Sequence, residues 1–392
     1  MRIRYSAKKD GRPVKRAMVY TSDEHGVNFA DVDPEAVYII ERLRANGFES
    51  YIVGGAVRDL ILGRKPKDFD IVTGASPSRI KKIFRNARII GRRFRLVHVY
   101  FGPKIFEVST FRSLKDGPTS NTFGSIEEDV RRRDFSMNAL FYDPLKRLVV
   151  DYVDGMRDIR RKRVRPIIPL GTIFTDDPVR MIRAVKYAAA TGFKLPLPVK
   201  WKIKRQSRLL GSISPSRLTE EIFKIIQSPA AAGIVENLEA LGLYAYLQPR
   251  ASALMRGNPA FRARYLKSLS DSDREDAGRA LAALIRDYLE DFVNWDAGIT
   301  ETYKTAFLEG RRFVLPMNPP RAELDRGVRL ILGEHGMTVK RARLFDRGGI
   351  EKAEDPAISP GEPKKKRRRR RRKSPAPEVP IPEDPIKTTI TG

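Results

Sequence analysis

The sequence predicts an α+β head, followed by an all-helical arm and a charged tail. Between residues 34 and 154, short apolar runs of strand length alternate with segments of helical spacing. Beyond residue 154, helical segments are separated by short Gly, Pro and Ser breaks. From about residue 351 the chain is dominated by Pro, Lys, Arg and Glu, which cannot bury enough apolar area to offset the entropy of ordering, so this tail is expected to be disordered.

The head is expected to combine a mixed sheet with helices. A helix is expected over residues 34–46, where Val37, Ile40 and Leu43 share one face. Gly102 and Pro103 are expected to turn a hairpin. The expected strands are 51–53, 68–72, 96–101, 105–111 and 148–153, the further helices are 57–62, 77–84 and 126–140, and a loop is expected at 117–125.

The spacing divides the chain into five expected parts. These are a basic N-terminal extension over residues 1–33, a catalytic head over 34–154, a neck over 155–228, a helical body over 229–350 and the tail over 351–392. In the neck and body, helices are expected at 177–191, 198–209, 215–227, 231–241, 279–292 and 301–312.

The charge balance points to a polyanionic partner. Lys and Arg number 76 against 48 Asp and Glu, which gives a net charge of +28. Nucleic acid is the commonest partner of such a chain, and an anionic membrane surface is the alternative. Without the ten consecutive bases at 364–373 the remainder is still at +18. The tail is expected to act as an electrostatic tether for nucleic acid such as RNA, and to offer a surface for protein partners. The alternatives are a solvated segment without function and a nuclear-targeting signal.

Several classes of protein are disfavoured. The chain has no cysteine, which excludes disulfides and thiolate metal sites and fits a reducing cytoplasm. Three histidines make a His-rich zinc site unlikely on composition grounds. No apolar run approaches the ~20 residues that a membrane-spanning helix needs.

Asp68 and Asp70 are the first candidates for chemistry. On a strand, side chains at i and i+2 share a face, so the two carboxylates would point together while Phe69 and Ile71 point into the core. Such a pair can share metal ions ~3.5–4 Å apart, the spacing of two-metal phosphoryl transfer. By itself the pair is weak evidence, because acidic pairs occur by chance and a solvated strand face explains them equally well.

A Gly-Gly turn precedes this pair. Residues 54–59, GGAVRD, follow an expected strand and open an expected helix. Glycines let backbone N–H groups approach phosphate oxygens, and Arg58 adds a fork-shaped donor. An ordinary strand-to-helix turn is the alternative, but the turn next to Asp68 and Asp70 favours a nucleotide site.

Many two-metal sites need a third acid, and two candidates remain. Glu107 lies in the expected strand 105–111, and Asp134 lies in RRRDFSMNAL at residues 131–140. A local salt bridge with its arginines is the alternative for Asp134. Spacing alone leaves the choice open.

A further motif carries Asp177, Arg180 and Arg183. Pro178 suits the first helical position and Asp177 the N-cap. Arg180 and Arg183 are three apart and therefore share a helix face. An Asp acceptor and an Arg donor on a rigid helix could read a base edge, and the alternative is a capped helix with solvent-facing arginines.

Taken in order, these motifs resemble the class II branch of the polymerase-β-like nucleotidyltransferases, which contains bacterial poly(A) polymerases and CCA-adding tRNA nucleotidyltransferases. The resemblance covers residues 51–226. It implies triphosphate binding by Gly54, Gly55 and Arg58, and two magnesium ions on Asp68 and Asp70 with Glu107 as an alternative ligand. It further implies Asp134 as a third catalytic acid, nucleotide contacts from Arg133 and Asn138, and base selection by Asp177, Arg180 and Arg183. Asp176 departs from the family's usual Glu.

Two stretches resemble the poly(A) polymerase branch, residues 84–99 and 123–129. The resemblance therefore implies RNA polyadenylation: template-independent addition of AMP from ATP to RNA 3′ ends by a monomeric enzyme. CCA addition to tRNA is the first alternative, and a non-catalytic RNA-binding protein on the same fold is the second. His98 is expected to be structural, and the loop 112–121 is shorter than in typical relatives.

Overall fold

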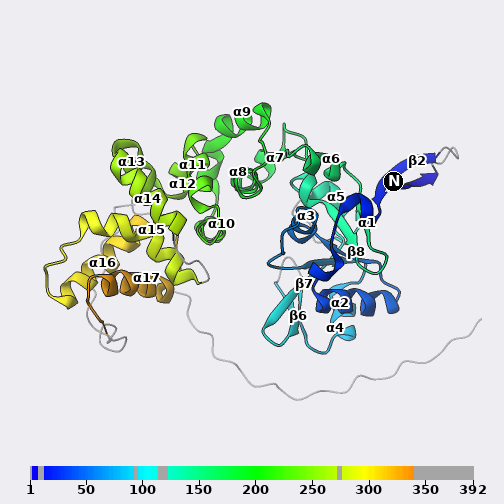
Figure 1. Cartoon of the computed structure of the whole chain (residues 1–392), viewed down its shortest axis with the longest axis horizontal. Helices are drawn as coiled ribbons and strands as arrows, with labels where there is room; N and C mark the ends of the chain where they lie inside the picture. Colours follow the sequence, from blue (N-terminus) through cyan, green and yellow to red (C-terminus); the bar gives the residue numbers. More distant parts are fainter. Residues whose placement is uncertain (1, 8–12, 92–95, 114–121, 272–275, 340–392) are drawn as a thin grey trace, which may run out of the picture. The chain divides into compact units, whose positions relative to one another are not determined.

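The computed structural model describes residues 2–7, 13–91, 96–113, 122–271 and 276–339. Contacts group the chain up to Val339 into one compact unit. The expected α+β head and helical arm are both present in it (Figure 1). The predicted tail at 351–392 and most of the predicted loop at 117–125 lie outside the described residues.

The head is built on a mixed sheet. Its strands in the described residues run in the order β1-β2-β9-β8-β3-β4-β7-β6-β5. Neighbours are antiparallel except for β4 and β7, which are parallel with Ile71 opposite Val108. The strands are β1 Arg2–Ala7, β2 Pro13–Tyr20, β3 Ser50–Val53, β4 Asp70–Thr73, β5 Ala87–Ile90, β6 Leu96–Phe101, β7 Lys104–Thr110, β8 Leu140–Asp143 and β9 Leu148–Asp151.

Short helices flank this sheet. The helix α2 begins at Pro34 as predicted, because Asp33 accepts the Glu35 N–H at 2.9 Å and caps it. It packs on β3 and β4, while α4 packs on β5 and β6 (Figure 1). The helices of the head are α1 Ser22–His25, α2 Pro34–Ala45, α3 Gly55–Ile61, α4 Pro77–Ile83, α5 Ile126–Arg132 and α6 Gly155–Arg160, with 3-10 turns at Phe29–Asp31 and Ser136–Asn138.

The N-terminal segment differs from the prediction. Residues 1–33 were expected to be an extension outside the head, but β2 pairs with β9, with Val19 opposite Val150. The side chains of residues 17–20 are buried. The strand β2 was not predicted, because the apolar run AMVY in the basic N-terminus is too short to stand out among the surrounding charges.

The predicted helix over 126–140 is also wrong in its second half. The helix α5 ends at Arg132, and the unpredicted strand β8 begins at Leu140. Asp134 accepts the Phe135 N–H at 2.8 Å, a local bond that competes with the helix. The Ser136 hydroxyl donates to the distant Asp158 at 2.6 Å and holds this segment against α6. The strand β5 was likewise not predicted.

The arm is helical, as predicted, and contains more helices than the spacing indicated. The helix α14 was missed although Phe261, Tyr265 and Leu269 are spaced four apart and buried. No described helix has the length and apolar character needed to cross a membrane. The helices are α7 Ile173–Asp176, α8 Val179–Thr191, α9 Leu197–Gln206, α10 Pro215–Ile226, α11 Ala231–Ala240, α12 Tyr244–Leu247, α13 Pro249–Gly257, α14 Pro259–Asp271, α15 Ala277–Phe292, α16 Ile299–Phe313 and α17 Arg321–Glu334, with a 3-10 segment at Ser207–Ser212.

One close backbone approach fixes the segment that carries Asn138. A Cβ added at Gly155 would lie 2.3 Å from the Ser136 carbonyl oxygen, whereas one added at Gly233 meets nothing within 4 Å. We expect Gly155→Ala to lower the free energy of unfolding by about 1–3 kcal/mol, the usual cost of overpacking. The matched change Gly233→Ala, on an exposed helix position, should raise it by up to about 1 kcal/mol. Urea titrations of the two variants measure both, and equal stabilities would contradict the close approach.

Candidate active site

The Gly-Gly turn lies directly against the predicted metal ligands. Strand β3 ends at Val53, and Gly54 has φ of +77°, in a region that residues with a Cβ rarely adopt. A Cβ there would lie 3.5 Å from Asp70 Oδ2 and 4.0 Å from Arg133 Nη1. Because β3 and β4 pair with Val53 opposite Asp70, the turn and the carboxylate are held together by the sheet itself.

A pocket of about 620 Å³ opens over Asp70. The sheet and the loop before β4 supply three of its carboxylates and α10 supplies the fourth, Glu221, while helices α8 and α10 supply most of its cations. Six predicted site residues therefore come together. The lining residues are Gly55, Arg58, Asp68, Phe69, Asp70, His98, Ile105, Glu107, Arg183, Lys186, Tyr187, Glu221 and Lys224.

The surroundings of Asp70 in this pocket disfavour its charged form. Surrounding protein replaces much of its water shell, and the negative charges of Glu107 and Asp68 add to this, so the pKa of Asp70 is raised to about 6. Arg133 and Lys224 act in the opposite direction. The side chain is still reached by solvent through the pocket mouth. Desolvation and the two neighbouring carboxylates therefore disfavour the charged form of Asp70 in the absence of a bound cation.

The carboxylates at this place in the pocket suit a hard divalent cation. No group of three His, Cys, Asp or Glu side chains among the described residues converges as a complete metal site. Mg²⁺ is usually held by one or two carboxylates together with water and substrate phosphates, so Asp68 and Asp70 fit that ion without a third protein ligand.

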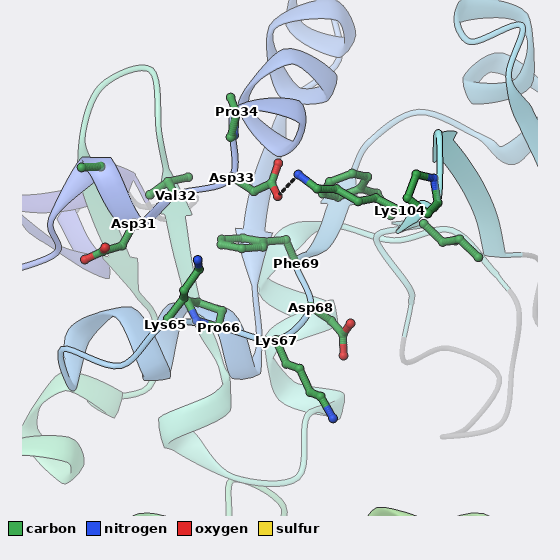
Figure 2. Close-up of a pocket in the computed structure, with 14 residues that line it drawn as sticks. Asp31, Val32, Asp33, Pro34, Lys65, Pro66, Lys67, Asp68, Phe69 and Lys104 are labelled. Carbon is green, nitrogen blue, oxygen red and sulfur yellow. Dashed lines mark hydrogen bonds and ion pairs between the residues drawn. The ribbon is translucent and has the colours of Figure 1, made fainter. Parts of the chain in front are cut away.

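Asp68 reaches this pocket from outside the strand. It was expected inside β4, but β4 begins at Asp70, so Asp68 lies in the preceding loop. Figure 2 shows its carboxylate turned away from the ring of Phe69. Asp68 also borders a second cavity of about 680 Å³ beside α2, in which Lys104 pairs with Asp33 at 2.9 Å.

The Arg58 guanidinium is fixed in orientation by hydrogen bonds and keeps donors for an anionic ligand. Its Nε and Nη2 donate to Asp59 at 2.8 and 2.9 Å, and its Nη1 donates to Asn138 Oδ1 at 2.9 Å. The guanidinium also lies over the Tyr187 ring at 5.6 Å. These contacts use three of its five N–H donors and leave others for a ligand. Asn138, which was predicted to contact nucleotide, orients Arg58.

The two candidate third acids are separated by the fold. Glu107, on β7, lines the pocket with Asp68 and Asp70. Asp134 does not line it and lies 3.6 Å from Arg183 Nη1. Geometry therefore favours Glu107 as the acid nearest the pair.

Helix α10 contributes residues that the sequence reasoning missed. The buried Glu221 accepts from Arg183 at 3.3 Å and from Lys186 at 2.6 Å. Burial alone would raise the pKa of Glu221, but Lys186 and Arg183 hold it below its usual value. Glu221 thus fixes two cations at the pocket wall. No local motif marks it, since it lies 38 positions from Arg183.

The predicted base-reading pair is not brought together. Asp177 pairs with Arg217 Nη2 at 2.9 and 3.0 Å, whereas Arg180 is buried and its Nη1 donates to the Ile173 carbonyl at 3.3 Å. Arg180 instead lines a cavity of about 290 Å³ together with Arg133. The Arg133 guanidinium also lies near Gly54, so it stands between this cavity and the Asp70 pocket. The cavity is lined by Ser109, Arg112, Asp129, Arg132, Arg133 and Arg180.

Comparison with known proteins identifies the family. Residues 50–165 match the poly A polymerase head domain, and residues 192–255 match the probable RNA and SrmB-binding site of polymerase A. From the head into the arm, the chain is thus similar to poly(A) polymerases. The recognition made from the four ordered motifs is thereby confirmed.

Relatives of both kinds are similar to this chain. Poly(A) polymerase I of Salmonella typhi is 42% identical over 250 residues, which cover 60% of this chain and 53% of that protein. The CCA-adding enzyme of Geobacillus stearothermophilus is 39% identical over 219 residues, covering 54% of each. The chain thus spans about half the length of the curated relatives it matches. The crystal structure of the Bacillus stearothermophilus CCA-adding enzyme in complex with CTP matches with a TM-score of 0.53 at 28% identity, covering 77% of this chain and 83% of that one.

The raised pKa of Asp70 predicts a pH-dependent stability difference. The folded protein binds the Asp70 proton more tightly than the unfolded chain, whose pKa is near 3.8, so ionisation above about pH 6 costs the native state free energy. Asp70→Asn removes this cost and should raise Tm above pH 6. The gain should fade toward pH 4, where both states hold the proton. Thermal scans of wild type and variant from pH 4 to 8 test this, and a pH-independent difference in Tm would refute it.

Proposed function

We propose that this chain is a poly(A) polymerase that adds AMP from ATP to RNA 3′ ends without a template, with Mg²⁺ as cofactor. The proposal is carried by one pocket that is lined by Asp68, Asp70, Glu107 and Arg58, together with similarity to poly(A) polymerase I. We assign catalysis to residues 34–154, nucleotide choice and RNA contact to 155–228, and further RNA contact to 229–350. The absence of cysteine supports a cytoplasmic location.

The Gly-Gly turn and Arg58 would bind the triphosphate. Backbone N–H groups at Gly54 and Gly55 can approach phosphate closely, because neither residue has a side chain. The free donors of Arg58 suit phosphate oxygens, and Arg183 and Lys186 place two more positive charges on the same pocket wall. These cations balance part of the charge that the triphosphate brings.

The carboxylates would hold the metal. Mg²⁺ on Asp68 and Asp70 supplies Lewis acidity, which makes the primer hydroxyl more acidic and stabilises the triphosphate charge. Glu107, across from Asp70, adds the negative potential that favours cation binding. Asp70 must be ionised to bind Mg²⁺, so activity should fall below about pH 6 at low Mg²⁺.

Base choice is assigned to the neighbouring cavity. Its guanidiniums present donors to acceptor atoms of a base, and Arg180 is fixed there by burial. Asp177, still proposed as the acceptor, would have to exchange its Arg217 partner for the base. The first alternative, CCA addition, is supported by the 39% identity to a CCA-adding enzyme. A non-catalytic RNA-binding role is disfavoured by the intact carboxylates.

One assay separates these readings. The full chain is incubated with Mg²⁺, each NTP alone or all together, and either an unstructured RNA or a tRNA lacking CCA. We expect long tails from ATP alone on unstructured RNA. Addition that stops after CCA on tRNA would replace the proposal with the alternative. No extension by wild type under any condition, with RNA still bound, would leave only the non-catalytic reading; Asp70→Asn is the inactive control.

The placement of the third acid gives a separate prediction. We expect Glu107→Gln to lower kcat on the order of 10²-fold and to raise the Mg²⁺ concentration needed for half activity, because it removes negative charge beside Asp70. Asp134→Asn should leave the Mg²⁺ requirement unchanged and mainly raise KM for NTP, since it loosens Arg183. Mg²⁺ titrations of both variants decide the matter, and the reverse pattern would assign the role to Asp134.

A further inference from the structure

Helix α9 presents a face unlike the rest of the described surface. Val199 and Ile203 are buried beneath it, as expected for an amphipathic helix. On the outer side, however, Leu197 is 78% exposed and Trp201 is 59% exposed. One exposed apolar side chain is ordinary, but a Leu and a Trp one turn apart form a small apolar platform in water.

This platform is surrounded by unpaired positive charge. Between residues 194 and 208 there are six cations and no acid. None of the six forms an ion pair with a residue that the structure describes, in contrast to arginines of the body such as Arg264, which pairs with Asp291 at 2.7 Å. The six are Lys194, Lys200, Lys202, Lys204, Arg205 and Arg208.

The Trp201 ring is held from one side. The Arg205 guanidinium lies over it at 5.1 Å from the ring centroid, a cation–π contact that limits its rotation. The large remaining exposure leaves ring surface open to another flat group. An oriented aromatic ring among unpaired cations matches the chemistry of single-stranded nucleic acid, in which bases stack and phosphates need counter-charges.

We propose that this face, made of Leu197, Trp201, Lys204 and Arg205 of α9 with Arg208 of the following 3-10 segment, binds single-stranded RNA by stacking a base on Trp201. The proposal rests on RNA being the substrate of the proposed function, and it names the residue and the contact by which the arm holds that RNA. It goes beyond the match of residues 192–255 to an RNA- and protein-binding region, which assigns no residue or mode of binding. Stacking reads no sequence, which suits a polymerase that acts on many 3′ ends.

Other ligands fit this face less well. An interfacial membrane helix buries a continuous apolar side in lipid, but the apolar side of α9 already packs inside the protein. The cavity beside α2 is also lined by lysines, yet its Lys65, Lys67 and Lys104 are matched by three aspartates. The cations in and around α9 are not matched by any acid between residues 194 and 208, so they favour a polyanionic ligand.

Trp201 fluorescence provides the test. The chain has two tryptophans, so the full-length Trp295→Phe variant reports on Trp201 alone. We expect oligo(A) of about ten nucleotides, within the usual range of such sites, to quench its emission. Inorganic polyphosphate of equal charge should compete for binding without quenching, because it has no bases. Quenching by neither polymer, by both equally, or only a response to phosphatidylglycerol vesicles would overturn the proposal.

Variants distinguish stacking from folding and from catalysis. Trp201→Ala should weaken oligo(A) binding roughly 5- to 100-fold, whereas Trp201→Phe, which keeps an aromatic face, should restore most of it. KM for RNA should rise in Trp201→Ala while kcat at saturating RNA changes by less than about twofold. Unchanged RNA affinity in Trp201→Ala, with a native Tm, would refute the site. Asp70→Asn should keep full quenching, so failure of the catalytic proposal would leave this result intact.

Discussion

The contact between Gly54 and Asp70 is the constraint on which the site depends. The sheet places Val53 opposite Asp70, and the positive φ of Gly54 turns the chain past that carboxylate. Asp70 is thereby crowded by protein and exposed to the charges of Asp68 and Glu107. A carboxylate kept this way costs free energy in the absence of a cation, as is usual where groups of like charge are gathered for function.

The helical arm contributes cations to the pocket that contains Asp70. Arg183 and Lys186 reach the pocket from α8, and Lys224 reaches it from α10. Their geometry depends on Glu221, whose buried carboxylate binds both Arg183 and Lys186. Because Glu221 is paired with these cations, the carboxylates Asp68, Asp70 and Glu107 remain for a metal ion, and the cations lie where phosphates could bind, which suits phosphoryl transfer.

Arg133 links the pocket to the cavity beside it. Asp129 holds its guanidinium at 2.9 and 3.1 Å, and Phe141 lies beneath it at 5.2 Å. From this fixed position it lies near both Gly54 and the guanidinium-rich cavity that contains Arg180. On α9, by contrast, the cations form no ion pair with a described residue, which suits backbone contacts to a long flexible ligand rather than recognition of one nucleotide.

The sequence by itself determined the motifs, their order and the family, because ordered short motifs survive independently of how the chain packs. It also predicted α2, β3 and α8 closely, since their apolar spacing and caps are local signals. Only the tertiary structure placed Glu107, and not Asp134, in the pocket with the Asp68–Asp70 pair. It also placed Asp177 with Arg217 instead of Arg180, and introduced Glu221 from 38 positions away. These outcomes depend on strand register and on helices meeting across long stretches of chain, and a local pattern contains no information on either. The Asp68–Asp70 pair illustrates this division. The sequence showed that the pair is present, whereas the raised pKa of Asp70 results from the fold.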